Sequence, residues 1–83
     1  MKIRRNIAIS DSGFIFNPDT GESFSTNALA VEIFNQLKEE KSFDEISEKI
    51  MKNYHVEQAT FEKDYHDFMG FLEQYNLLEN EQA

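Results

Sequence analysis

The sequence predicts an α+β fold in which a three-stranded antiparallel sheet precedes three helices, in the order βββααα. Two observations support this prediction. Before Asn27, short runs of β-branched and aromatic residues alternate with turns that contain glycine, as in strands joined by hairpins. After Asn27, apolar residues recur at intervals of three and four, which indicates amphipathic helices. With 83 residues and no cysteine, residues 1–83 are expected to form one domain that apolar packing stabilises.

The first predicted strand covers residues 3–9, where alternation places Ile3, Ile7 and Ile9 on one face of an extended chain. Arg5 shares that face near its end. The turn-forming residues 11–13 separate this strand from the next.

The second and third predicted strands, residues 14–16 and 22–26, flank a four-residue hairpin loop. Pro18 fixes φ at the first loop position, and Gly21 can adopt a positive φ at the last. The third strand is polar. Only Phe24 offers a large side chain to a core, and the serines beside it face the opposite side.

Three helices are expected after the sheet. The first begins at a cap formed by Thr26 or Asn27 and runs to about Glu39. The second follows a capping box in residues 42–45, and the third covers roughly residues 58–75. The positions expected on their apolar faces are Ala30, Ile33, Phe34 and Leu37, then Phe43, Ile46, Ile50 and Tyr54, then Phe61, Tyr65, Phe68, Leu72 and Tyr75.

The chain end is expected to return to the core. Asn76 is suited to ending the third helix in a left-handed conformation, after which Leu77 and Leu78 fold back. A disordered tail is expected from about residue 79 to residue 83.

Charge limits the classes of partner. Sixteen acidic and eight basic residues give a formal net charge of −8, and the basic residues form no stripe. Such a domain repels nucleic acid and acidic membranes but tolerates or attracts a basic peptide. No apolar run approaches the roughly twenty residues of a membrane span, and no signal peptide is expected, so a cytoplasmic location is the default prediction.

The sequence shows no pattern typical of a catalytic, cofactor or metal site. His55 and His66 have no second nitrogen or sulfur ligand near them in sequence, so a surface or partly packed role is favoured over metal binding. Asp64, Asp67 and Glu73 are explained by a solvated acidic helix face. We therefore expect a protein that is not an enzyme and that needs no cofactor.

The third helix and the polar third strand leave two interpretations open. Phe71 and Tyr75 widen the helix's apolar stripe, which suits either a broad buried face or an apolar groove beside the sheet. A polar edge strand next to such a groove could bind a peptide by strand addition. The alternative is an edge made polar to discourage aggregation.

Three helices with a small sheet also describe a winged-helix-like domain. A regulator or accessory subunit of that kind, which contacts DNA or a protein, is the alternative hypothesis. The sheet precedes the helices, whereas the wing of the usual DNA-binding order comes last, and the third helix is acidic. Both points count against DNA binding.

Two longer segments together point to a known family. In "FIFNPDTGESFSTNALAVEIFNQL" a hairpin leads into a helix that starts at an asparagine and carries an aromatic residue two turns later. In "SFDEISEKIMKNYHVEQATFEKDYHDFMGFLEQYNLLE" a short helix, a Tyr-x-Val break and a last helix closing on two leucines follow. From about Ile7 to Glu79 the chain resembles the PqqD family and the related recognition elements for ribosomally made precursor peptides. It departs from them in "STN", where many members have Leu-Asn, and at Asn76, where many have glycine.

The resemblance implies a non-catalytic peptide chaperone. Members bind the leader of a precursor peptide as an added strand beside the last helix and present it to a modifying enzyme, often a radical SAM protein. Carried onto this sequence, the implied site comprises Glu22, Ser23, Phe24, Ser25 and Thr26 of the third strand and Asp64, Phe68, Phe71 and Tyr75 of the third helix. A monomer and a homodimer through the open strand edge are both compatible with this interpretation.

Overall fold

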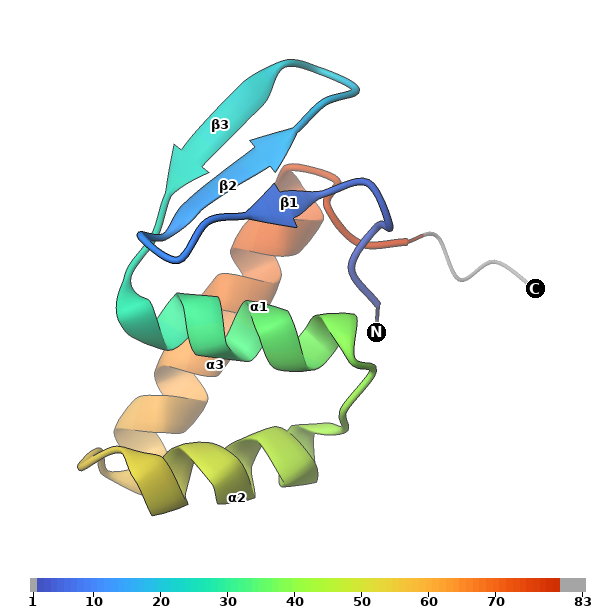
Figure 1. The fold of residues 1–83 in the computed structure, drawn as a ribbon. Helices are drawn as coiled ribbons and strands as arrows, with labels where there is room; N and C mark the ends of the chain where they lie inside the picture. Colours follow the sequence, from blue (N-terminus) through green and yellow to red (C-terminus); the bar gives the residue numbers. More distant parts are fainter. Residues whose placement is uncertain (1, 80–83) are drawn as a thin grey trace.

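The computed structural model describes residues 2–79 and confirms the predicted order of three antiparallel strands followed by three helices. In Figure 1 the sheet lies above α1, α2 is farthest from the sheet, and α3 passes behind α1 to reach the sheet. The elements are β1 (Ala8–Ile9), β2 (Phe14–Asn17), β3 (Glu22–Ser25), α1 (Ala28–Lys38), α2 (Phe43–Asn53) and α3 (Gln58–Gln74).

The first strand is much shorter than predicted. Only Ala8 and Ile9 pair with β2, because the chain turns just before them, where the Ile7 amide donates to the Arg4 carbonyl at 3.2 Å. This turn leaves the Arg5 side chain exposed, whereas an extended chain would have pointed it toward the core together with the isoleucines. Burying an unpaired guanidinium is costly, so the alternation of isoleucines alone gave a wrong strand length.

The β2–β3 hairpin has the predicted loop. Asn17 pairs with Glu22, and Gly21 takes a φ of 77°. The Gly21 amide donates to the Asn17 carbonyl at 2.8 Å. The side chain of Asn17 is buried, and its Oδ1 accepts from the Asp19 amide at 3.0 Å. Local hydrogen bonds therefore hold both ends of the loop.

The helix starts follow the predicted caps. Asn27 is the cap of α1, and its Oδ1 accepts from the Ala30 amide at 2.9 Å. Ser42 and Glu45 form the predicted capping box of α2. In α3, Glu57 precedes the helix without a side-chain cap. Two of the three helices thus begin where a side chain satisfies a free backbone amide.

One core lies between the sheet and the helices. Its buried apolar side chains are Ile3, Ile7, Ile15, Ala30, Ile33, Phe34, Leu37, Ile46, Ile50, Phe61, Tyr65, Phe68, Met69, Leu72 and Leu77. The predicted apolar faces of the helices are confirmed except at two positions. Tyr54, which follows α2, and Tyr75, at the end of α3, are exposed.

The chain end returns to the core as predicted. Asn76 takes a φ of 59°, and the Leu77 amide then donates to the Leu72 carbonyl at 2.8 Å. Ile3 and Leu78 form an isolated antiparallel bridge. The Glu79 amide donates to the Lys2 carbonyl at 2.7 Å, and the rest of the predicted tail lies outside the described residues.

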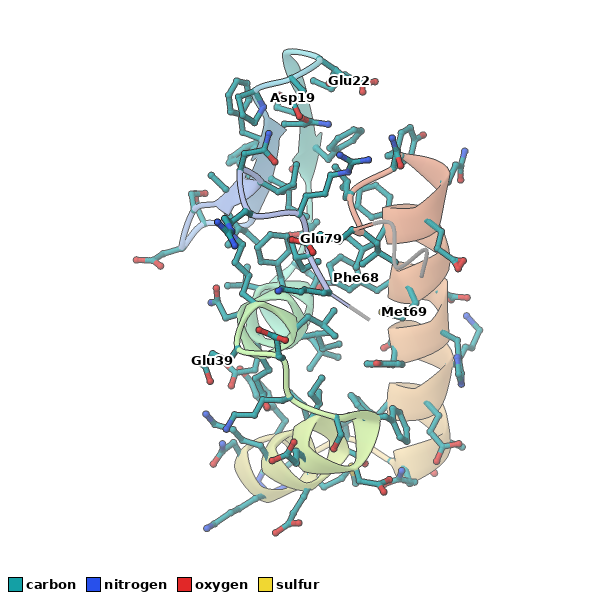
Figure 2. All side chains as sticks on the ribbon, turned by 90° about the vertical axis from the view of Figure 1, so that its right-hand side faces the viewer. Asp19, Glu22, Glu39, Phe68, Met69 and Glu79 are labelled. Carbon is teal, nitrogen blue, oxygen red and sulfur yellow. The ribbon has the colours of Figure 1, made fainter. Side chains whose placement is uncertain are left out.

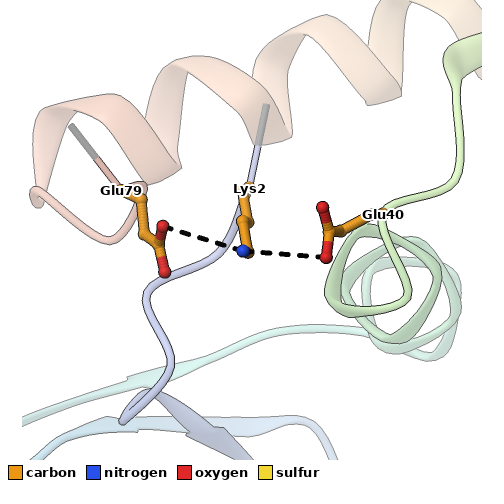
Figure 3. Close-up of polar contacts among 3 residues, drawn as sticks. All are labelled: Lys2, Glu40 and Glu79. Carbon is orange, nitrogen blue, oxygen red and sulfur yellow. Dashed lines mark ion pairs between the residues drawn. The ribbon is translucent and has the colours of Figure 1, made fainter. Parts of the chain in front are cut away.

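An ion-pair cluster joins this bridge to the end of α1. The Lys2 ammonium lies 3.6 Å from the carboxylate of Glu40 and 4.0 Å from that of Glu79, as drawn in Figure 3. All three side chains are partly or largely exposed, so the cluster adds little stability. It lies on α1's C-terminal end, away from the first turn of that helix.

Between residues 2 and 79, no helix combines the length and the apolar character that a membrane crossing requires.

Candidate functional site

The third strand has a free edge. Within the described chain the sheet order is β1-β2-β3, so β3 pairs with β2 on one side only. The open side presents backbone amides and carbonyls that a further strand could pair with. At about 3.3 Å per residue, the four residues of β3 span about 13 Å.

The hydrogen bonds around β2 show which amides face this edge. The Thr26 amide donates to the Gly13 carbonyl at 2.7 Å, so Thr26 points its backbone toward β2. The Phe14 carbonyl accepts from Ser10, on the side away from β3. Because backbone direction alternates along an antiparallel pair, the amides and carbonyls of Ser23 and Ser25 face the free edge.

The two faces of β3 differ. The half-buried Phe24 packs toward α3, while Ser23 and Ser25 are exposed on the outer face of the sheet. On the same outer face, the neighbouring strand β2 places Phe16 opposite Ser23 and Phe14 opposite Ser25. The polar side chains of β3 thus point to solvent, and its one aromatic side chain points to the helix.

The facing wall on α3 is a stripe of side chains at spacings of four, three and four residues. Phe71 and Tyr75 form the end nearest the strand: their ring centroids lie 5.3 Å and 4.7 Å from that of Phe24. Phe68 continues the stripe, with its ring 5.9 Å from that of Phe71. In Figure 2, Phe68 points from α3 toward α1. Asp64 lies one turn before Phe68, toward the N-terminus of α3, and its side chain is exposed.

A cavity of about 280 Å³ opens at the Asp64 end of this stripe, between α3 and the start of α1. The strand β3 leads directly into that start through Thr26 and Asn27. The cavity is therefore next to the C-terminal end of the free edge. Its lining residues are Asn27, Leu29, Ala30, Ile33, Asp64, Asp67 and Phe68.

The charged groups near the cavity are mostly acidic. Asp64 and Asp67 line it, and Asp67 accepts a hydrogen bond from the Lys63 ammonium at 2.9 Å. That hydrogen bond raises the pKa of Lys63. Tyr65 is one of the buried residues of α3, and burial raises the pKa of its phenol, which is therefore neutral at physiological pH.

Of the sequence-predicted site residues, the structure brings Phe24 together with Phe71 and Tyr75, and Phe68 contacts Phe71. Glu22, Ser23, Phe24 and Ser25 form β3, Thr26 follows it, and the four helix residues form the stripe. The prediction did not include Leu29, Ile33 or the other cavity residues on α1. Nothing local in the sequence shows that the first turns of α1 lie against Asp64, because packing sets that contact.

Neither of the two histidines lines the cavity. His55 is exposed in the loop between α2 and α3. His66 is exposed on α3, with its ring 6.4 Å from that of Phe43. Among residues 2–79 no group of three or more histidine, cysteine or acidic side chains is arranged to hold a metal ion.

Comparisons with known proteins agree with this architecture. The chain is similar to a solved structure described as TbiB1 in complex with the TbiA(beta) leader peptide. The two chains share 31% sequence identity, the match covers 100% of each, and the TM-score is 0.81. No curated protein matches the chain. The profile of a family described as coenzyme PQQ synthesis protein D (PqqD) matches residues 13–78, which include both strands of the hairpin and all three helices. The chain therefore belongs to the PqqD family.

Proposed function

We propose that this protein binds the leader segment of a ribosomally made precursor peptide as an added strand on β3. The observation that carries the proposal is the free edge of β3 beside the aromatic stripe of α3. Strand addition needs both features, because backbone hydrogen bonds provide affinity and pockets for alternate side chains provide selectivity. The similar structure, a TbiB1 chain with a leader peptide, supports the same class of ligand.

The role is that of an adaptor without chemistry of its own. The site consists of a strand edge, aromatic rings and two aspartates, and no nucleophile is paired with a base there. We propose that the bound leader is presented to a separate modifying enzyme, a radical SAM protein being the first candidate, in the cytoplasm. A domain with a net charge of −8 is poorly suited to the alternative role of DNA binding.

Affinity in the micromolar range fits a site of this size. A four-residue strand with two or three side-chain contacts offers a modest surface, and a Kd of about 1 μM corresponds to about −8 kcal/mol.

An NMR titration of ¹⁵N-labelled protein tests the proposal. The titrants are leader peptides from precursor genes adjacent to the gene for this protein, with a scrambled peptide as control. We expect saturable shifts concentrated on the amides of β3 and on Phe68, Phe71 and Tyr75. Binding that leaves these amides unshifted would place the peptide elsewhere, and no binding of any leader would contradict the adaptor role.

A further inference from the structure

The cavity at the end of β3 has an apolar floor. Leu29 is half-buried, and Ile33 and Phe68 are buried, with exposed fractions of 1% and 9%. A long side chain that entered between α1 and α3 would therefore place its methylene groups on these three residues.

The rim of the same cavity is acidic. Asp64 and Asp67 line it and are exposed, and no lysine, arginine or histidine is part of the lining. Asp67 already pairs with Lys63, whose ammonium lies 2.9 Å from its carboxylate. Asp64 has no ion pair among the described residues, so its charge is the less compensated of the two.

The start of α1 and the Lys63 ammonium oppose this acidic rim. The free amides at a helix N-terminus carry about half a positive charge, and the first turn of α1 contains no acidic residue. The Asn27 side chain already accepts from one of these amides. Two full carboxylate charges on α3 outweigh this partial charge, even with Lys63 bound to one of them, so the cavity favours a cation.

The position of the cavity connects it to the strand edge. A peptide paired with β3 reaches Thr26 and Asn27 at one end, and Asn27 lines the cavity. On the helix-facing side of β3 itself, the rings of Phe24 and Tyr75 are already in contact, with centroids 4.7 Å apart. A long side chain at the α1 end of the paired peptide can therefore enter this cavity.

We propose that this cavity binds a lysine or arginine side chain of the leader peptide and that Asp64 selects it. The methylene stem would lie on the apolar floor while the charged group reaches the rim, as long basic side chains commonly do. This inference rests on the proposed function, because the basic side chain must belong to the strand paired with β3.

A display library of random dodecapeptides, selected against the full chain, tests the inference without a known ligand. Three proteins are used: wild type, Asp64→Asn and Glu73→Gln. Glu73 is the matched control because it lies nine positions after Asp64 in the helix, which places it on the opposite face of α3. We expect lysine or arginine to be enriched at one fixed position in peptides selected by wild type and Glu73→Gln, and not in those selected by Asp64→Asn.

The strongest selected peptide then allows a double-mutant cycle. Replacing its enriched basic residue with uncharged norleucine should weaken binding to wild type about threefold to tenfold in calorimetry at low salt. The same replacement should have little effect on binding to Asp64→Asn. Salt at 0.5 M should reduce the difference in affinity between the basic peptide and the norleucine peptide for wild type, because screening weakens an exposed ion pair. Asp67→Asn should have a smaller effect than Asp64→Asn.

The outcomes separate this inference from the proposed function. If selected peptides shift the β3 amides in NMR spectra but show no basic preference, or if norleucine binds equally well, the inference is wrong and the adaptor role stands. If no peptide is selected, or if the shifts avoid β3, the proposed function fails and the inference fails with it. If Asp64→Asn only lowers the unfolding midpoint and leaves the peptide preference unchanged, Asp64 serves to stabilise the start of α1 and the inference is overturned.

Discussion

Phe71 stands at the boundary between the core and the candidate site. Its ring contacts Phe24 on the strand and both Phe68 and Tyr75 on its own helix, yet the side chain is only half-buried. A residue in this position can support the fold and still present a surface to a ligand. The sequence left open which of these roles Phe71 has, and its partial exposure shows that it does not belong wholly to the core.

We therefore predict that Phe71→Ala weakens leader binding about tenfold while the fold survives. Truncating a half-buried ring should cost clearly less than the about 3–5 kcal/mol typical of a fully buried aromatic. Phe61→Ala is the matched comparison, because Phe61 is completely buried on the same helix. Urea unfolding and peptide titration of both variants provide the test. Unfolding costs that are equal in the two variants would assign Phe71 to the core.

The capping box gives a pH-dependent prediction at Glu45. The hydrogen bond from the Ser42 amide, 2.9 Å long, lowers the pKa of the Glu45 carboxyl below its ordinary value of 4.5. Because the folded pKa is below the unfolded one, the carboxylate stabilises the fold fully above about pH 4.5. That contribution is lost as the pH falls through the lowered folded pKa.

The Glu45→Gln variant isolates this effect, because glutamine keeps an acceptor oxygen but does not titrate. The difference in unfolding free energy between wild type and variant should be constant from pH 7 to pH 6 and should change as the pH falls below about 4.5. A carboxyl pKa measured by NMR provides the direct check. A value at or above 4.5 would show that the hydrogen bond to Ser42 is weak in solution.

At the scale of elements, local chemistry was enough to predict the helices. Asn27 and Ser42 cap α1 and α2 where expected, and Gly21 and Asn76 take the positive φ expected at the hairpin loop and at the end of the last helix. The third strand ends one residue earlier than predicted, at Ser25, and the amide and hydroxyl of the following Thr26 both donate to the Gly13 carbonyl.

Long-range packing accounts for what the sequence did not predict. The period of the isoleucines could not reveal the turn that shortens the first strand, which lies where the Arg4 amide donates to the distant Leu77 carbonyl at 2.9 Å. The strand and stripe residues were predicted from the polar edge, the helical spacing and the family resemblance. The cavity was not predicted, because it depends on contact between residues near 29 and near 64, and no local pattern specifies that contact.

The orientation of the β3 amides leads to a prediction about the strand itself. Proline at Ser23 or Ser25 removes an amide that faces the free edge, without breaking a hydrogen bond to β2. Each substitution should weaken leader binding about fivefold or more, since one backbone hydrogen bond contributes about 1 kcal/mol. Alanine at the same positions keeps the amide and serves as the control. Unchanged leader affinity in both proline variants would contradict strand addition.

At the scale of the whole molecule, the open edge raises the question of self-association. An unpaired strand can pair with its own copy, and Phe14 and Phe16 are exposed on the adjoining outer face, at 54% and 45%. Two features oppose such pairing. The edge is only four residues long, and each copy carries a net charge of −8.

We therefore predict that the protein is a monomer of 9.7 kDa at about 10 μM and physiological salt. Pairing through a four-residue strand would bury far less than the roughly 1,000 Å² expected of a stable interface, and mutual repulsion of the acidic copies would weaken it further. Sedimentation equilibrium at 0.15 M and 1 M NaCl distinguishes the effect of the short strand edge from that of charge repulsion. If repulsion alone prevents pairing, dimers should form at high salt, whereas a limiting edge length keeps the protein monomeric at both concentrations. A dimer at physiological salt that leader peptide or Ser25→Pro dissociates would contradict the prediction, and would show that self-pairing competes with the ligand for β3.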